Sequence, residues 1–276
     1  MKALKFTLEG RTGFFKRPDV NSNIYFTYGH IHKVALLGIF GAILGYGGYN
    51  QRNLKISETK GKKKDAKKEV KKEEIVPEFY ERLKDLKVSI VPRNKRGFIE
   101  KKVNVFNNSV GYASQEKGGN LIVKEQWLEN PSWDIYVLLE GEEGEKISKA
   151  LLNREYVYLP YLGKNDHRAD ILNVEINSCE KLLGASKIDS FFKRESFSLL
   201  KEEEDIFESL EGEEEEKFTS LKEEEEPFKY EEFLPIALKE ETNSYKKVCL
   251  VYTNSSLKEE EESLVYRVGE KNLQFI

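Results

Sequence analysis

The sequence predicts an α+β fold, and three observations lead to it. Apolar residues Leu4, Phe6 and Leu8 alternate with polar ones in 2–10, as in a half-buried strand. An uncharged apolar run at 34–46 follows and has the length of a buried helix. Strand-like and helix-like patterns then alternate along the chain, which favours helices and strands in one domain.

The remaining elements complete the pattern. We expect strands at 87–94, 132–141 and 172–182, short helices at 77–86 and 142–155, and a long β-hairpin at about 95–130. The order is β-α-β-β-α-β with the hairpin inserted as a thumb between the second and third strands. This is the ferredoxin-like, or RRM-like, arrangement, which carries many unrelated functions.

Composition divides the chain into a ferredoxin-like domain at 1–185 and a small, acidic, β-rich C-terminal region at 186–276. Strands are expected there at 246–252, 263–268 and 272–276. Two biased segments, a Lys-rich insert at 57–75 and an acidic run at 202–226, are predicted to be solvated connectors.

The net charge of −4 conceals an asymmetry between the two ends of the chain. Residues 1–100 hold 22 Lys and Arg against 11 Asp and Glu, a net of +11, which leaves 23 against 38 for the rest, a net of −15. A basic N-terminal part is compatible with nucleic-acid binding, because binding depends on where the charges lie.

Hydropathy and cysteine content argue against several other classes of protein. The apolar run at 34–46 is shorter than the roughly 20 residues that a spanning helix needs, so no membrane partner is expected. Cys179 and Cys249 are isolated, which argues against a disulfide framework and against a zinc site. We therefore expect a cytoplasmic protein with no metal and no cofactor; the family resemblance described next implies that the cytoplasm is prokaryotic.

Two sequence blocks resemble a known family. The first runs from Gly10 through Thr27-Tyr28 to the stretch GAILG at 41–45, and the second is YLPYLGKNDHRADI at 158–171. Together they resemble the CRISPR-associated RAMP proteins of the fifth Cas family, with the type I-B branch most similar. The stretch EEFLPIAL at 231–238 is also similar to the family, so the resemblance spans most of the chain.

The resemblance implies a non-catalytic, RNA-binding subunit of a Cascade effector complex in antiviral defence. Such a subunit holds the 5′ handle of the CRISPR RNA and contacts the backbone subunit and the large subunit. It meets target DNA only indirectly, through the complex. In the type I-C branch the corresponding protein is itself a metal-independent endoribonuclease, and this is the alternative function.

The loop 11–33 is the first candidate site, because cations and aromatic residues alternate along it. Cations can neutralise phosphates and aromatic rings can stack on splayed bases, and Lys33 lies where a helix dipole also favours phosphate. The alternative is a solvated basic loop above aromatic core residues. The candidate RNA-binding residues of this loop are Arg11, Phe15, Lys16, Arg17, Tyr28 and Lys33.

Two further patches complete the candidate site. Lys164 and Arg168 lie beside the flexible Gly163, although Asp166 and Asp170 would repel phosphate. The predicted thumb supplies Lys95, Arg96, Lys101 and Lys102. For each patch the alternative is an ordinary charged surface, such as a hairpin whose charges prevent aggregation.

An endoribonuclease would need a general base near the 2′-hydroxyl and a group that protonates the leaving oxygen. His30, His32 and His167 are the only histidines, and Tyr28 and Lys33 flank the first two. A histidine in a loop is more often a surface residue than a catalytic one, so the sequence favours a protein that is not an enzyme.

Overall fold

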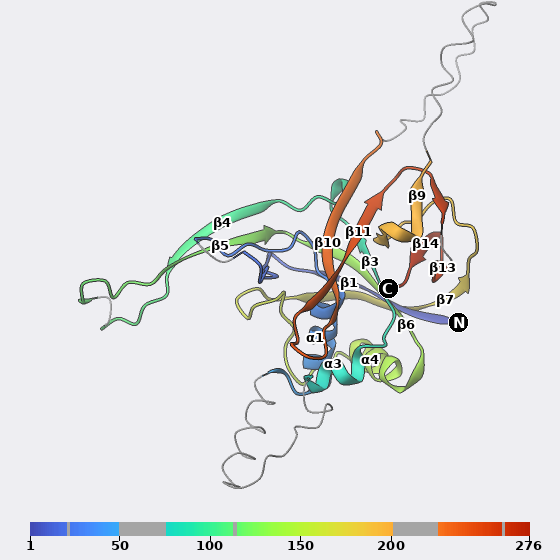
Figure 1. Cartoon of the computed structure of the whole chain (residues 1–276). Coiled ribbons are helices and arrows are strands. Elements are labelled where there is room, and N and C mark those ends of the chain that lie inside the picture. Colours follow the sequence, from blue (N-terminus) through green and yellow to red (C-terminus); the bar gives the residue numbers. More distant parts are fainter. Residues whose placement is uncertain (21–22, 50–75, 113–114, 201–225, 261–262) are drawn as a thin grey trace, which may run out of the picture.

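The fold is mixed α/β, with mostly strands and few helices, in this computed structural model (Figure 1). The structure describes residues 1–20, 23–49, 76–112, 115–200, 226–260 and 263–276. The Lys-rich insert predicted at 57–75 lies outside the described residues, as does almost all of the acidic run at 202–226.

Helices are few and short. They are α1 (Lys33–Leu44), α3 (Glu78–Leu83) and α4 (Gly141–Asn153), with 3-10 turns η2 (Lys95–Gly97) and η4 (Arg194–Ser196). The strands of the first part are β1 (Lys2–Glu9), β2 (Thr12–Gly13), β3 (Val88–Pro92), β4 (Lys101–Asn107), β5 (Ile122–Glu129), β6 (Ser132–Leu138) and β7 (Asp170–Lys181). Those of the C-terminal part are β8 (Phe192–Lys193), β9 (Phe197–Leu199), β10 (Lys229–Leu238), β11 (Tyr245–Thr253), β12 (Leu257–Glu259), β13 (Val265–Val268) and β14 (Lys271–Gln274).

Six strands form the main sheet in the order β14-β13-β7-β1-β6-β3, and every neighbouring pair is antiparallel. Apolar side chains of β1 and β6 meet on one face, in the cross-strand pairs Leu4–Val137, Phe6–Ile135 and Leu8–Trp133. This is the face that the alternation in residues 2–10 predicts. Such paired apolar side chains are the main source of sheet stability.

The helices α1, α3 and α4 gather on that face of the sheet (Figure 1). Leu36, Leu37 and Phe40 of α1 are fully buried, and the ring of Phe40 lies edge-on to Phe6 with centroids 6.1 Å apart. The apolar run is therefore a core helix. No helix in the described part of the chain is both long and apolar enough to cross a membrane.

Both ends of α1 are set by local hydrogen bonds. His32 caps the start, because its Nδ1 accepts the backbone N–H of Ala35 at 3.2 Å. The sequence predicts that Gly47-Gly48 stop the helix, but it ends earlier. Gly45 takes the left-handed conformation, with φ 77°, and its N–H turns back to Ala42.

The glycines inside α1 have different surroundings. A Cβ added to Gly41 would lie 2.4 Å from the Cβ of Phe79, so this glycine allows α3 to approach α1. A Cβ added to Gly38 would meet no described residue within 4 Å. Among the described residues, Gly38 therefore borders open space.

The C-terminal strands β13 and β14 extend the main sheet beside β7. Beyond β14, Ile276 exchanges backbone hydrogen bonds of 3.0 and 3.2 Å with Val88 on β3, which links the two edges of the sheet. The division into 1–185 and 186–276 stays a prediction, but the main sheet takes strands from both parts. Side chains on the face away from the helices form a second buried cluster that includes Ala3, Tyr136 and Phe275.

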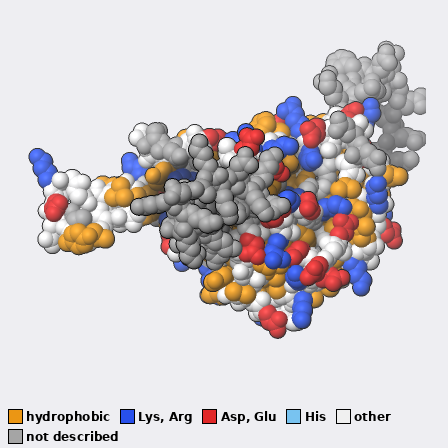
Figure 2. Space-filling view, turned by 60° about the horizontal axis from the view of Figure 1, so that its bottom comes forward, with side chains coloured by type: hydrophobic (Ala, Val, Ile, Leu, Met, Phe, Trp, Pro, Cys, Tyr) orange, Lys and Arg blue, Asp and Glu red, His pale blue; other side chains and the backbone are white. Residues whose placement is uncertain are grey.

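The hairpin predicted at 95–130 forms from β4 and β5 and projects away from the rest of the molecule (Figure 1). Its base is joined to the body by β2, which pairs with β5. Figure 2 shows hydrophobic side chains along the projecting hairpin, whereas Lys, Arg, Asp and Glu intermingle over the body.

The C-terminal part holds more strands than the sequence predicts. β10 and β11 form a long antiparallel pair, and Leu234 and Leu250 from these strands join the core beside α1. The sequence does not predict β10, because Pro235 and the glutamates that precede it weaken the strand pattern. A register irregularity lies between Pro235 and Ala237.

Candidate nucleic-acid interface

The two sequence blocks that carry the family resemblance meet in space. The backbone N–H of Phe14 donates to the carbonyl of Leu162 at 3.0 Å. A Cβ on Gly163, which has φ 84°, would lie 2.0 Å from the carbonyl oxygen of Phe14, so only glycine fits there. Further along, Val157 donates to the carbonyl of Ile43 in α1 at 2.9 Å. The segment 156–163 therefore runs beside both the first loop and α1.

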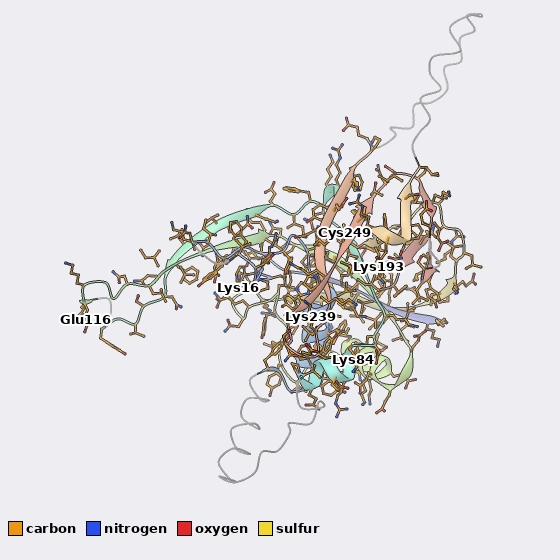
Figure 3. The ribbon with its side chains drawn as sticks, viewed as in Figure 1. Lys16, Lys84, Glu116, Lys193, Lys239 and Cys249 are labelled. Atoms are coloured by element: carbon orange, nitrogen blue, oxygen red, sulfur yellow. The ribbon has the colours of Figure 1, made fainter. Side chains whose placement is uncertain are left out.

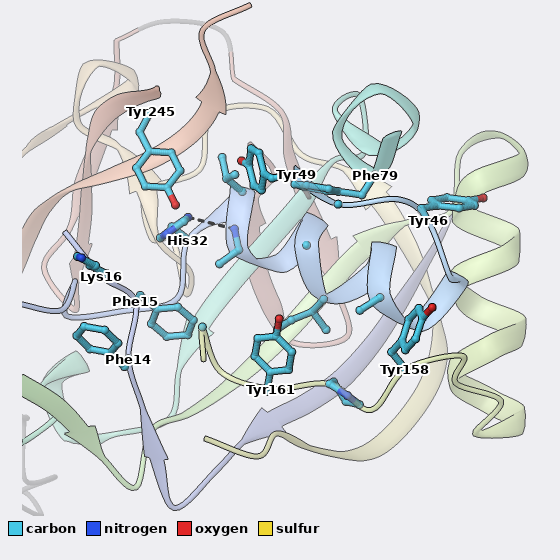
Figure 4. Close-up of a pocket in the computed structure, with 18 residues that line it drawn as sticks. Phe14, Phe15, Lys16, His32, Tyr46, Tyr49, Phe79, Tyr158, Tyr161 and Tyr245 are labelled. Carbon is cyan, nitrogen blue, oxygen red and sulfur yellow. Dashed lines mark hydrogen bonds between the residues drawn. The ribbon is translucent and has the colours of Figure 1, made fainter. Parts of the chain in front are cut away.

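A groove of about 790 Å³ runs along α1, and residues of both blocks line it; we call it the α1 groove. Most of its rings stand along the two sides of the helix: Tyr46, Tyr49, Phe79 and Tyr245 on one side, and Phe14, Phe15, Tyr158 and Tyr161 on the other (Figure 4). Lys16 lies at one end. The remaining lining residues are His32, Val34, Ala35, Gly38, Ile39, Ala42, Gly48, Pro160 and Gly163.

Lys16 joins the groove to the hairpin. Its side chain is exposed, and Nζ lies 3.9 Å from the ring centroid of Tyr25, a favourable cation–π distance. Tyr25 is fixed to β5, because its N–H donates to Lys124 and its carbonyl accepts from Gln126, both at 2.9 Å. Figure 3 places Lys16 near the base of the hairpin, far from Glu116 at the tip. No ion pair to Lys16 is formed within the described residues.

Arg17, the next residue in the loop, is half-exposed. Its guanidinium pairs with Asp19 at 3.3 Å and lies 5.7 Å from the ring centroid of Tyr28. Asp19 also pairs with Lys247 of β11 at 3.3 Å. Arg17 is thus partly neutralised, and Lys16 remains the more available cation.

Phe15 and Tyr28 are core residues, with 3% and 1% of their surface exposed. The alternative interpretation, core aromatics beneath a basic loop, therefore describes these two better than base stacking does. Phe15 lies edge-on to Trp133, and burial raises the pKa of Tyr28 to about 12. Neither ring offers a free face to RNA.

Lys33 does not join the loop cations. Its Nζ donates to the backbone oxygen of Ile276 at 3.1 Å and it does not line the α1 groove. Burial lowers the pKa of this amine to about 8. The position at the start of α1 is as predicted, but the side chain fastens the sheet edges instead of facing a phosphate.

The second predicted patch is neutralised from within. Lys164 pairs with Asp166 at 3.0 Å and with the buried Glu125 of β5 at 3.3 Å. Arg168 is 80% exposed at the side chain and lies 3.7 Å from Asp170. The Gly163 loop therefore fastens the hairpin to the body, and only Arg168 remains open to a ligand.

Two of the four candidate cations of the hairpin form ion pairs with glutamates. Arg96 pairs with Glu226 at 2.6 Å, and Lys102 pairs with Glu129. Lys95 and Lys101 are exposed, as is Arg11 in the first loop. Surface pairs of this kind are worth about 0–1 kcal/mol, so a phosphate can displace them.

The histidines are buried and held by hydrogen bonds. Trp133 Nε1 donates to His30 Nδ1 at 3.0 Å, and His30 Nε2 lies 2.7 Å from the carbonyl oxygen of Gly97, so Nε2 carries the proton. Because the Nδ1 of His32 accepts from Ala35, its proton also sits on Nε2. Burial lowers the pKa of both rings to about 3. Neither ring has a lone pair free to act as a base in this arrangement.

His167 links the body to the hairpin. Its Nδ1 lies 2.7 Å from the hydroxyl of Thr12, and its ring lies edge-on to Trp127 with centroids 4.6 Å apart. Burial lowers its pKa as well. The described residues contain no cluster of three or more His, Cys, Asp or Glu side chains that could hold a metal ion.

Sequence reasoning missed the residues that shape the α1 groove, above all Gly38, Tyr49, Tyr161 and Tyr245. Tyr161 lies inside a quoted motif, but nothing in its spacing shows that it faces α1. Tyr245 comes from β11, more than 200 residues after α1 begins, so only the fold brings it there. The single local signal is the spacing of the small residues Ala35, Gly38 and Ala42 on one helix face.

Comparisons with known proteins complete this description. No protein-family profile and no curated protein sequence matches the chain. Among solved structures, the chain is similar to one described as a CRISPR RNA-guided surveillance complex, with a TM-score of 0.47, 13% identity, and 92% of this chain and 91% of that chain covered. It is also similar to a CRISPR protein from Archaeoglobus fulgidus, with a TM-score of 0.46, 14% identity, and 99% and 98% covered.

Another similar structure also has a CRISPR-related description. A third, described as a Cas protein, has a TM-score of 0.30 and 14% identity, with 59% of this chain and 57% of that chain covered. All three TM-scores are below 0.5.

Proposed function

We propose that this protein is a non-catalytic, RNA-binding subunit of a type I CRISPR effector complex of the I-B kind. It holds the 5′ handle of the CRISPR RNA and joins the backbone and large subunits in the prokaryotic cytoplasm. It contacts target DNA only through the complex. The proposal includes the assignment to the RAMP proteins of the fifth Cas family.

One observation carries the proposal. The two blocks that resemble the family, 10–45 and 158–171, are separated by more than 100 residues in the sequence but line the same groove and meet at Phe14 and Gly163. Segments that matter for one binding site are expected to converge in this way. The strand order β7-β1-β6-β3 is also the order that a ferredoxin-like chain would produce. This order supports the ferredoxin-like fold that the sequence predicts for the chain.

The charges support an RNA ligand. Four cations are exposed near the junction of the first loop and the hairpin. The loop supplies Arg11 and Lys16, and the base of the hairpin supplies Lys95 and Lys101. Backbone hydrogen bonds of Tyr25 join the loop to the hairpin. Exposed cations beside aromatic rings are the combination that single-stranded RNA binds, because phosphates need counter-charge and bases need flat surfaces. Each phosphate contact makes affinity fall with salt.

The test is a double substitution, Lys16→Ala with Arg17→Ala, in the protein co-expressed with a CRISPR array and the backbone and large subunits. We expect the purified complex to lose handle-bearing RNA or to fail to assemble. The matched control is Lys84→Ala with Lys87→Ala, which removes the same charge beside α3. Unchanged assembly and RNA content in the Lys16/Arg17 variant would refute the site.

The non-catalytic part has its own test. The isolated chain is incubated with CRISPR-repeat RNA in EDTA, and we expect no discrete cut, because His30 and His32 hold no free lone pair. A specific cut that His32→Ala abolishes would instead establish the endoribonuclease alternative.

A further inference from the structure

The α1 groove differs in charge from three other cavities in the described part of the chain. The described residues that line it include one cation, Lys16, and no carboxylate. The other three mix acids with bases: Glu81, Glu240 and Glu241 with Lys84 and Lys239 near α3, Glu100 and Glu129 with Lys95 and Arg96 at the hairpin base, and Glu9 and Asp170 with Arg11 beside β1. The chain has 49 acids against 45 bases, so a carboxylate-free groove of this size favours an anionic ligand.

The floor of the groove is flat and the walls are aromatic. Ala35, Gly38 and Ala42 share one face of α1, and no residue in the described part of the chain lies within 4 Å of a Cβ added to Gly38. Tyr245 and Tyr161 stand on opposite sides of this face (Figure 4). Tyr161 is 44% exposed, so the ring offers a surface and its hydroxyl can remain in water. A thin, planar, apolar group suits this shape.

We propose that the α1 groove binds one or two unpaired bases of single-stranded RNA, with an adjoining phosphate at Lys16. This inference rests on the proposed RNA-binding function and deepens it by assigning base stacking to the groove and phosphate binding to the loop. Phe15 and Tyr28 are buried, so stacking belongs to Tyr161, Tyr245 and Tyr49 instead. The volume of about 790 Å³ lies within the range of roughly 300–1,000 Å³ typical of small-ligand sites.

A protein segment is the competing occupant. An apolar helix or strand would cover the aromatic rings but would give the Lys16 amine no partner, and an acidic peptide would use Lys16 but not the rings. A nucleotide uses both in adjacent positions, because base and phosphate are covalently joined. This is why the observations favour RNA.

The experiment separates stacking from phosphate contact by their salt dependence. The full chain is titrated with a fluorescent single-stranded RNA of about 12 nucleotides, a length within the usual range of such sites. Titrations run between about 0.05 and 0.2 M salt. Gly38→Leu fills the groove from its floor, and Asn153→Leu, on the exposed end of α4, is the neutral control for adding the same side chain elsewhere.

We expect Gly38→Leu to weaken RNA binding by about 5- to 100-fold at every salt concentration, as the loss of one stacked base predicts, with the slope of log affinity against log salt unchanged. Lys16→Ala should instead make the slope shallower by about 0.7, the value for one phosphate on a single strand. Asn153→Leu should bind as the wild type does. Tyr161→Ala changes a half-exposed loop residue and should weaken RNA binding as much as Gly38→Leu does. This variant keeps the test valid if the leucine at position 38 disturbs α1.

The outcomes distinguish this inference from the proposed function. If the wild type binds RNA but Gly38→Leu and Tyr161→Ala bind it equally tightly, the groove takes no base, and a protein segment becomes its occupant. A changed salt slope in either groove variant also overturns the inference, since it would mean that a phosphate contact was lost. If the wild type itself binds no RNA, the proposed function fails and the inference with it.

Discussion

The two faces of α1 contrast within a single helix. On one face Leu36, Leu37 and Phe40 are fully buried. On the other face Gly38, between Ala35 and Ala42, borders a groove lined by aromatic rings. Gly41 follows Gly38 by three residues and so lies beside it on the helix surface, at the border of the two faces, where Phe79 covers it. The comparison teaches that the role of a glycine depends on what packs against it, even for two neighbours on one helix.

The largest effect is expected on the buried face. Phe40→Ala should reduce the free energy of unfolding by about 3–5 kcal/mol, because the side chain is fully buried and the change leaves a cavity beside Phe6. Urea denaturation of the full chain measures it. A loss below about 1 kcal/mol would mean that this face is not the core and would break the comparison.

His30 and His32 lie just before the start of α1 and should make the free energy of unfolding depend on pH. Burial gives each ring a folded pKa of about 3, against the ordinary histidine value of 6.5, so the unfolded chain binds more protons than the folded one as pH falls below 6.5. Stability should drop by about 2 kcal/mol per histidine between about pH 7 and pH 5. His32→Asn keeps a side-chain cap and should remove about half of this drop, read as the slope of unfolding free energy against pH.

Gly41→Ala should destabilise the protein by about 1–2 kcal/mol. The added Cβ would lie 2.4 Å from the Cβ of Phe79, so α3 must shift, and overpacking of this kind outweighs the gain of about 1 kcal/mol in helix propensity. Chemical denaturation beside the wild type measures the difference. An unchanged midpoint would show that α3 moves freely and that Gly41 is not closed off.

The smallest effect has the opposite sign. Gly38→Ala should raise the free energy of unfolding by about 0.5–1 kcal/mol, because alanine restricts the unfolded chain and its methyl group meets no described residue within 4 Å. The same method applies to both glycines, so each variant is the control for the other. Equal signs at Gly38 and Gly41 would contradict the contrast between the two glycines.

Much of the fold could be predicted because its signals are local. The alternation in residues 2–10 predicts β1, and the apolar run predicts α1 within a few residues of its observed ends. The hairpin follows from two extended segments around a turn. The sequence does not predict β10, because Pro235 and the glutamates before it conceal a strand whose stability comes from pairing with β11.

The candidate site was less predictable. Lys16 is where the alternation of charge and aromatic residues predicts an exposed cation, but the same pattern includes Phe15 and Tyr28, which are buried. Residue type does not distinguish a ring that stacks on a base from one that fills the core. Lys33 has the expected position and a different partner, because Ile276 reaches it only through closure of the sheet.

The sequence by itself determined the first strand, the apolar helix that is too short for a membrane, and the projecting hairpin. These depend on short-range periodicity and spacing, which a chain carries before it folds. Only the tertiary structure decided which rings are free and which cations are paired, and that β11, the segment 156–163 and α1 enclose one groove. Burial and pairing are set by residues distant in the sequence, so Gly38 and Tyr245 acquire a shared role only when the chain brings them together.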